Sequence, residues 1–402
     1  MRKLGIMLLI LAMLPTSGCW GRVELNDLSI VTASAIDKME DGKYLLTLQI
    51  AVPTMLGPAS GSGSGGSGSG DGNKATVVVS EKGVTMLDAC RRLQKKLPRQ
   101  LFFSHSRIII IGEQLAREGV APVLDFFVRY RESRLRSYIL FSEGKAAEIL
   151  KFNAKWEKIS AEEIREEEKR HVAIRIYLKD FFQMLLTDGI EPIAAQVALR
   201  QTEIDNEEGS SGGDMNTVIS GSAVFRKDKL VGWLDDAETR GALWLRNELK
   251  TSVVTVEISK DKGGGNISAM AVRKATKIKP ILRDRKLRIQ GDIYMENTVY
   301  ENNSSLDMSD PKIIQYVEQE LELETKRRIQ STIEKAQKTF NSDIFGFGNA
   351  VYRAYPKAWN RQFKESWDDV FPELEVDIKP HAKVVRTGLT NKSMITVEEG
   401  EE

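Results

Sequence analysis

The scarcity of cysteine most limits what this chain can fold into. Only Cys19 and Cys90 occur among 402 residues. Cys19 follows a short apolar leader. Cys90 falls in a helical pattern of apolar residues, where a buried and inert thiol is the expected role. If Cys19 is modified at the N-terminus, Cys90 has no partner within the chain. We therefore expect a fold that core packing holds without disulfides.

The first 18 residues have the features of a secretory signal peptide. Arg2 and Lys3 precede an apolar core of about eleven residues, whereas a membrane-spanning helix needs roughly 20. The small residues Thr16 to Gly18 then precede Cys19, which indicates cleavage before Cys19 and lipid attachment to its thiol. The alternative is an ordinary signal peptide with an incidental cysteine, since Thr16 stands where lipoproteins usually have a large aliphatic residue.

Composition sets the class of the remaining chain. Roughly 380 residues follow the leader, more than one hydrophobic core normally holds, so two or three domains are expected. Apolar content of 41% and charged content of 29% are typical of a globular protein. The 58 cations and 57 anions nearly balance, which argues against nucleic acid as a partner. No later segment is apolar enough to cross a bilayer, so only the N-terminus is expected to anchor the body.

Residues 19–205 are predicted as an N-terminal α+β domain in which strands alternate with helices. A hairpin is expected from strands at 28–36 and 44–52. The Gly/Ser-rich segment 57–73 is predicted as a flexible loop, and whether it is natural or inserted stays open. The charged run Glu162 to Arg170 is interpreted as a solvated helix face or loop. Further strands are expected at 75–80, 107–111, 137–141 and 192–204, with helices at 84–96, 113–130, 145–152 and 175–186.

Residues 206–214 are polar and glycine-rich and are predicted as a linker to a C-terminal α+β region, 215–390. In that region Asp310 and Pro311 are expected to open one long helix, to about Phe340. An antiparallel meander is expected from three runs, with its second turn at Lys279-Pro280. The full set of expected elements is a hairpin at 216–226 and 229–233, a helix at 237–249, strands at 252–260, 266–278, 281–301 and 374–386, and an acidic tail at 391–402.

The predicted fold class is therefore α+β, with mixed sheets and packed helices in two to three domains. Within the C-terminal region, 215–262 and 263–390 are candidate subdomains.

Residues that could carry catalysis or bind a metal are sparse. His105, His171 and His381 are far apart in the sequence, and no HExxH, CxxC or G-x-S-x-G motif occurs. No cofactor, metal or catalytic site is therefore predicted. These observations favour a non-enzymatic exported binding or scaffold protein, and an envelope hydrolase is the least favoured alternative.

Several motifs together resemble those of one known family, in the same order along the chain. Residues 18–22 read GCWGR and are followed by ELNDL, and FSH at 103–105 is followed by IGE at 111–113. Nearer the C-terminus stand DIFGFG at 343–348, YPKAW at 355–359 and RTG at 386–388. The set resembles the C subunits of bacterial spore germinant receptors, the Ger(x)C lipoprotein family, over almost the whole chain.

That resemblance implies a lipid-anchored, non-catalytic subunit that is needed to initiate spore germination. Cys19 would hold it at the outer face of the spore inner membrane, beside two integral membrane subunits of the A and B types. The alternative is a solute-binding lipoprotein that captures the germinant directly. A pocket lined by aromatic residues and a few polar groups would favour that alternative.

Two aromatic motifs are candidates for partner docking or for structure. The FGFG segment is expected to end the long helix, because paired glycines permit unusual backbone angles. The second motif repeats at four-residue spacing and predicts either a core stripe against the meander or an exposed docking face. Burial of its tryptophans would argue against docking. The candidate site residues are Cys19, Phe345, Gly346, Phe347, Gly348, Trp359 and Trp367, with Phe363 inside the second motif.

Overall fold

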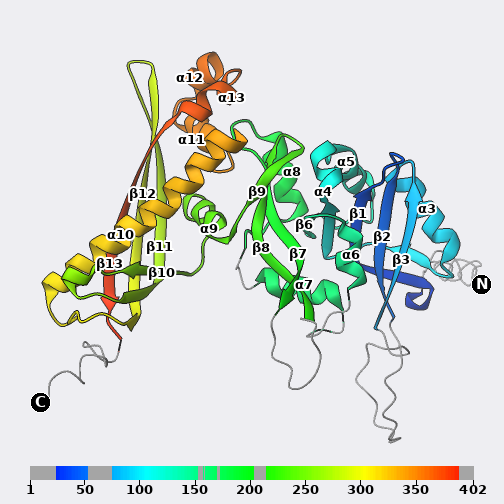
Figure 1. The fold of residues 1–402 in the computed structure, drawn as a ribbon. Coiled ribbons are helices and arrows are strands. Elements are labelled where there is room, and N and C mark those ends of the chain that lie inside the picture. Colours follow the sequence, from blue (N-terminus) through cyan, green and yellow to red (C-terminus); the bar gives the residue numbers. More distant parts are fainter. Residues whose placement is uncertain are drawn as a thin grey trace, which may run out of the picture.

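The computed structural model describes residues 24–52, 75–152, 157, 159–169, 173–202 and 214–388. These residues form two β-sheets with helices packed on them, side by side in an elongated molecule (Figure 1). The α+β prediction is confirmed. The leader with Cys19, the Gly/Ser segment and the acidic tail lie outside the described residues. Within the described residues, no helix has the length and apolar character needed to cross a bilayer.

The first sheet has nine strands in the order β3-β2-β1-β5-β6-β7-β8-β9, with β4 beside β1. Its centre is parallel, from β1 through β5 and β6 to β7, and an antiparallel hairpin extends it on each side. The strands are β1 (Leu28–Lys38), β2 (Tyr44–Ala51), β3 (Thr76–Gly83), β4 (Gln100–Phe102), β5 (Ile108–Gly112), β6 (Tyr138–Ser142), β7 (Ile193–Thr202), β8 (Asp214–Arg226) and β9 (Lys229–Leu234).

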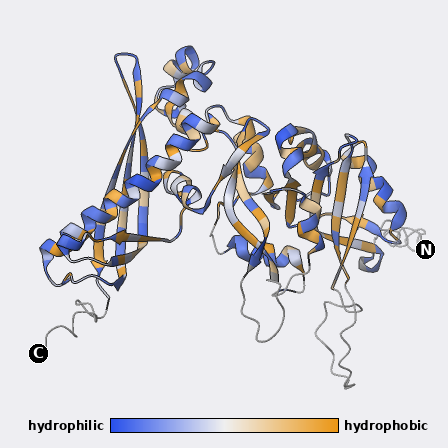
Figure 2. Ribbon diagram, in the orientation of Figure 1, coloured by the Kyte–Doolittle hydropathy of each residue, from blue (hydrophilic) through white to orange (hydrophobic). Residues whose placement is uncertain are grey.

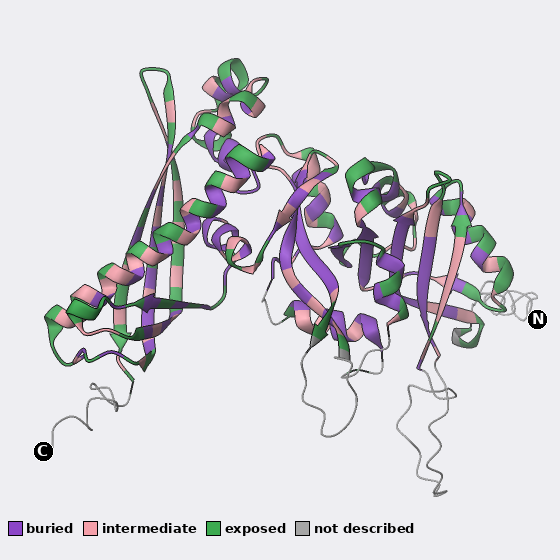
Figure 3. Ribbon diagram, viewed as in Figure 1, coloured by how far each residue is buried: buried purple, intermediate pink, exposed green. Residues whose placement is uncertain are grey.

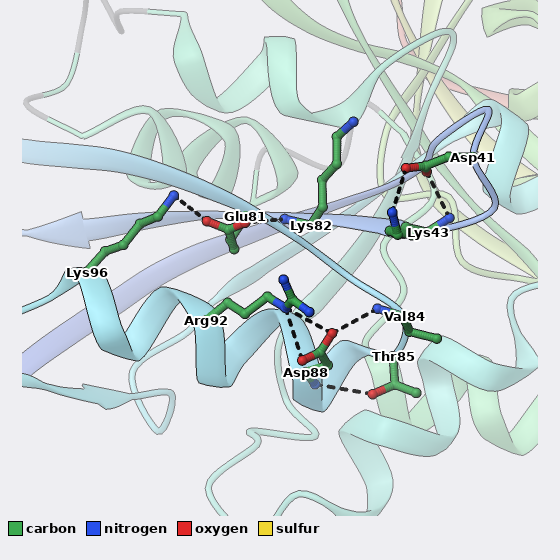
Figure 4. Close-up of polar contacts among 9 residues, drawn as sticks. All are labelled: Asp41, Lys43, Glu81, Lys82, Val84, Thr85, Asp88, Arg92 and Lys96. Carbon is green, nitrogen blue, oxygen red and sulfur yellow. Dashed lines mark hydrogen bonds and ion pairs between the residues drawn. The ribbon is translucent and has the colours of Figure 1, made fainter.

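Six helices pack on this sheet, and polar side chains set where they begin. Helix α3 starts after Thr85, whose hydroxyl accepts from the Asp88 amide at 3.2 Å, so it begins two residues later than predicted (Figure 4). At α6, the amides of Ala146 and Ala147 donate to Asp37 of β1. The helices are α3 (Met86–Lys96), α4 (Glu113–Glu118), α5 (Ala121–Arg129), α6 (Ala146–Lys151), α7 (Ser160–Lys169) and α8 (Leu178–Leu186).

The charged run at 162–170 is not wholly solvated as expected. It forms α7, but Glu163 and Glu168 are buried because the helix lies against β8. Glu163 accepts a hydrogen bond from the Thr217 hydroxyl at 3.0 Å, and burial raises the pKa of Glu168 to about 8. Charge patterning alone does not show which face of such a helix meets a sheet.

The predicted linker at 206–214 does not separate the two sheets. Strands β7 and β8 flank it and pair with each other, so the first sheet continues to β9 at Leu234. The chain passes to the second sheet only after α9 (Asp236–Leu245). A polar, glycine-rich segment connects the strands of a hairpin as well as it connects domains, which is why composition misplaced this boundary.

The second sheet has four strands in the order β10-β11-β12-β13. The first three form the predicted antiparallel meander, but β13 is parallel to β12. The long helix α10 begins as predicted, with the Asp310 carboxylate accepting from the Lys312 amide at 2.8 Å. The elements are β10 (Ser252–Glu257), β11 (Asn266–Arg283), β12 (Lys286–Asn302), β13 (Glu375–Arg386), α10 (Pro311–Glu334), α11 (Phe347–Ala354), α12 (Pro356–Ala358) and α13 (Trp367–Val370).

The turn predicted at Lys279-Pro280 is wrong, because β11 continues to Arg283. Pro280 pairs with Ile289 inside the strand, and the turn lies at Asp284-Arg285. β10 pairs with β11 only from Asn266 to Ala271, so Pro280 stands where β11 has an open edge. A proline lacks the N–H that an inner strand would need, but an open edge tolerates it.

The edge of β13 is also covered rather than free. Its outward amides at Ala382 and Val384 each donate at 2.8 Å to a carboxylate of α10, Glu322 and Glu318 respectively. Outward amides alternate along the strand, so the next outward position before Ala382 is Pro380, which has no amide hydrogen. Helix and proline together leave this edge little capacity to pair with another strand.

We predict that Gly241→Ala destabilises the contact between α9 and α10. A Cβ at Gly241 would lie 2.0 Å from the Thr332 hydroxyl oxygen, so the two helices must move apart. The free energy of unfolding should fall by about 1–3 kcal/mol, as urea denaturation would measure. Arg240→Ala on the same helix removes only a surface ion pair with Asp236 and should change it far less. Equal losses in both variants would contradict this close packing.

Candidate functional site

The DIFGFG motif is organised around one buried carboxylate, that of Asp343. Its oxygens accept four hydrogen bonds, from the amides of Gly346 (2.9 Å), Phe347 (3.0 Å) and Gly348 (2.8 Å) and from the Trp367 indole (3.1 Å). The donors at 346–348 are free amides at the start of α11, which an acceptor at a helix N-terminus stabilises. Asp343 therefore ties the motif to the second aromatic segment.

The long helix ends before the FGFG segment, not within it. After Glu334 it continues as a π-helical turn, Lys335–Phe340, and Asn341 then takes a left-handed conformation with φ 45°. Gly346 has φ 76° immediately before α11, so its freedom serves the start of the next helix. The predicted end at about Phe340 is therefore confirmed, but Asn341, which tolerates the left-handed region, ends the helix in place of the FGFG segment.

The motif contacts the first sheet through the loop between α8 and β7. A Cβ on Gly348 would lie 2.6 Å from the Gly189 Cα, so the two backbones meet only because both are glycine. The Asn349 amide donates to the Gly189 carbonyl (2.8 Å), and the Glu191 amide donates to the Asp343 carbonyl (2.9 Å). We call this contact, residues 341–349 with 189–191, the junction.

The aromatic side chains of both motifs are buried. Trp359 is 1% exposed and Trp367 7%, with their ring centroids 5.2 Å apart. Phe345, Phe347 and Phe363 are also buried. This burial fits the core interpretation and argues against an exposed aromatic docking face. The tryptophans surround Gly348 beside the loop that precedes β7, a position that helical spacing alone does not reveal.

A cleft of about 800 Å³ opens beside the junction, and burial changes the acidity of two carboxyls there. Desolvation raises the pKa of Asp343 to about 6, although its four donors oppose the shift. Desolvation likewise raises the pKa of Glu191 to about 7. The cleft wall combines aliphatic, aromatic and charged side chains, among them Val128, Leu186, Asp188, Lys227, Trp359, Lys364 and Asp368.

The chemistry available at the junction is limited. Asp343 already accepts four hydrogen bonds, and no nucleophile with an adjacent base lies among the described lining residues. In the parts of the chain that the structure covers, no group of three or more His, Cys, Asp or Glu side chains is placed to hold a metal ion. The arrangement can fix the two sheets together and exchange a proton at Glu191.

The other candidate residues are scattered. His105 lies beside the Phe102 ring, His381 stacks on Tyr294 in the second sheet, and His171 is outside the described residues. Cys90 is buried, as predicted, and burial raises the pKa of its thiol to about 12. Cys19 also lies outside the described residues, so its lipidation stays a prediction.

Sequence reasoning included Asp343 in a motif but gave it no role, and it did not single out Glu191. A signal for Asp343 was present, because an aspartate followed by Gly-Phe-Gly at positions three to five can accept successive free amides. Nothing local marks Glu191, since its burial depends on contacts with residues more than 30 positions away.

Comparisons with known proteins cover nearly the whole chain. The family model described as spore germination protein N-terminal domain matches residues 21–199, and the model described as spore germination B3/GerAC-like, C-terminal, matches residues 220–388. The gap between the two models coincides with the predicted linker, although the first sheet crosses that gap.

Individual proteins show the same similarity. Spore germination protein KC of Bacillus subtilis (strain 168) is 30% identical over 400 residues, covering 96% of this chain and 95% of that protein. Spore germination protein YndF of the same organism is 27% identical, covering 96% and 97%. A crystal structure of the GerBC protein has the same fold, with a TM-score of 0.57, 21% identity, and coverage of 88% of this chain and 97% of that one.

We predict that Asp343→Ala severely weakens the junction. Four buried N–H donors lose their acceptor, and a cavity replaces the carboxylate, so the free energy of unfolding should fall by at least about 3 kcal/mol. Urea denaturation followed by tryptophan fluorescence would measure the loss. Asp368→Ala, at an exposed ion pair with Arg226, is the control and should cost under about 1 kcal/mol. Similar costs for both would show that Asp343 does not hold the motif.

We predict a pH dependence that Glu191→Gln reduces. The pKa of Glu191 is higher in the folded state than in the unfolded state. Its contribution to folding stability is therefore fully present below the unfolded pKa, and it is lost as pH rises through the folded pKa of about 7. Wild-type stability should therefore fall by about 2 kcal/mol between pH 5 and pH 8 from this group. In urea titrations the free energy of unfolding of Glu191→Gln should fall less over this pH range. That of the control Glu365→Gln, at an exposed position, should fall as much as in wild type. Identical slopes in all three proteins would contradict the assignment.

Proposed function

Since the chain belongs to the GerAC-like family of spore germination proteins, we propose that it acts as the lipid-anchored, non-catalytic subunit of a nutrient germinant receptor. The observation that carries the proposal is the length of the match. Both family models are present in order, and spore germination protein KC aligns over 95% of its own length. A role in the initiation of spore germination accounts for a match over the entire body rather than over one module.

The structure supports action through protein contacts. At its most constrained site the Asp343 carboxylate joins backbone segments, because all four of its hydrogen bonds go to amides and an indole of the fold. A buried joint between the two sheets suits a subunit that passes a mechanical or binding signal between partners. The proposed partners are two integral membrane subunits, of the A and B types.

The proposed location follows from the N-terminus. Cleavage after Gly18 would expose Cys19 for lipid attachment, and two or more acyl chains give stable anchoring. The described body contains no helix able to span a bilayer, so the lipid would supply the attachment. We place the subunit at the outer face of the spore inner membrane.

A second function, direct capture of the germinant, rests on one feature, the cleft beside the junction. Aromatic rings and a few charged groups line it, as expected for a small-solute site. Trp359 and Trp367 contact this cleft, so a bound solute should change tryptophan fluorescence. Titration with amino acids and sugars separates the two functions, because a scaffold subunit should show no saturable change.

We predict that Cys19→Ala releases the protein from membranes and abolishes its contribution to nutrient-triggered germination. The anchor would lose acyl chains that each contribute roughly 0.8 kcal/mol per buried methylene. Fractionation of washed spore membranes by immunoblot measures the release. Cys90→Ala is the matched control, because it removes the other cysteine from a buried site and should leave the protein membrane-bound. Cys19→Ala protein that stays fully in the membrane fraction would refute lipid anchoring.

A further inference from the structure

The hairpin of β11 and β12 projects beyond the rest of the second sheet (Figure 1). Its end carries a concentration of positive charge. Residues 279–288 contain five cations and one anion, in a chain whose net charge is +1. The hairpin end is hydrophilic in Figure 2 and exposed in Figure 3. We call its cations the cationic tip; they are Lys279, Arg283, Arg285, Lys286 and Arg288.

Strand register places these cations together. Arg283 pairs with Lys286, and Ile281 pairs with Arg288, so their side chains share one face of the hairpin. Lys279 lies on that face two residues further along. From Lys279 to Arg283 the strand advances roughly 13 Å, so the side chains can meet one flat surface at the same time.

The opposite face of the hairpin is already occupied. Ile278, Leu282 and Leu287 pack against the main core, and the Tyr355 hydroxyl donates to the Pro280 carbonyl at 3.4 Å. The hairpin is therefore held on one face and open on the other. Because the packed face fixes the hairpin, the exposed cations all point away from the core on the open face.

Several charges elsewhere on the open face form ion pairs, whereas those of the cationic tip do not. Arg273 pairs with Glu296, Lys379 with Asp377, and His381 lies 3.8 Å from Asp292. In the part of the chain that the structure describes, none of the five tip cations has an ion-pair partner. Charges that only kept the surface soluble would not need to be of one sign.

The turn itself retains a cation against local preference. Asp284 and Arg285 have φ of 47° and 62°, angles that two-residue hairpin turns normally fill with Asn-Gly. Arginine in the left-handed region costs roughly 1 kcal/mol relative to glycine. The sequence therefore places a positive charge where glycine would make the turn more stable.

We propose that the cationic tip docks on an anionic lipid surface. Each Lys or Arg near such a surface adds about 1 kcal/mol, and lipid headgroups can move laterally to meet unpaired side chains. Tyr294, 44% exposed on the same face, is of the type enriched at membrane interfaces. This inference goes beyond the proposed anchor: the anchor supplies proximity to a bilayer, and the tip supplies a second, electrostatic contact.

The test is sedimentation with vesicles of phosphatidylcholine, with or without phosphatidylglycerol. The full chain carries Cys19→Ala in every sample, so lipid anchoring plays no part and the leader contributes equally throughout. The tip variant is Lys279→Gln, Arg283→Gln, Lys286→Gln and Arg288→Gln. The matched control removes four exposed cations elsewhere, with Arg91→Gln, Lys95→Gln, Lys312→Gln and Lys326→Gln.

The unsubstituted tip should bind vesicles with phosphatidylglycerol and lose that binding as salt rises. The tip variant should bind about 600-fold more weakly, since each of its four lost cations contributes roughly fivefold, while the control should lose less than about threefold. Equal losses would mean that only net charge matters and would overturn the proposal. Binding to polyglutamate without any preference for phosphatidylglycerol would overturn it in favour of an acidic protein partner.

A single substitution separates docking from folding. Arg285→Gly relieves the turn, so it should raise the thermal midpoint while weakening vesicle binding about fivefold. A variant that is more stable and binds less cannot be explained by misfolding. If Arg285→Gly and the tip variant bind as well as the parent but aggregate more readily, the cations serve to protect the hairpin edge, and the proposal fails.

Discussion

The junction depends on the burial of one carboxylate, that of Asp343. A buried charge is costly unless its environment supplies compensating hydrogen bonds. Here three consecutive amides and an indole converge on it, from the start of α11 and from Trp367. Those donors would be unsatisfied without the carboxylate, and the carboxylate would be too poorly solvated without them. Each therefore makes the other's burial tolerable.

That mutual dependence explains why the DIFGFG motif combines an acid with glycines and aromatic residues. The carboxylate needs amides that approach closely, and a Cβ on Gly348 would collide with Gly189 and both tryptophans. The aromatic rings exclude water from the same space, which strengthens the hydrogen bonds that remain. The contact between the two sheets thus needs an acid, glycines and a tryptophan together. These residues come from distant parts of the chain, since Gly189 and Trp367 are more than 150 positions apart.

Local features of the fold could be predicted from the sequence, whereas long-range pairing could not. The Asp310 cap and the hydrophobic period of α10 depend on neighbouring residues, so that helix was placed correctly at its start. The parallel pairing of β13 with β12 joins residues 87 positions apart at Arg288 and Glu375, which no local pattern records. Pro280 misled for the same reason, because its tolerance depends on where β10 stops.

The open edges of the second sheet link the fold to its surface chemistry. Where α10 is near, the carboxylates of Glu318 and Glu322 satisfy the amides of β13. Beyond the end of β10, Pro280 leaves β11 without an outward amide, and lysine or arginine follows on the exposed face. To prevent edge pairing, proline and charged residues are needed only at the strand edges. The cations instead share one broad face, and this placement favours contact with an extended anionic surface over edge protection.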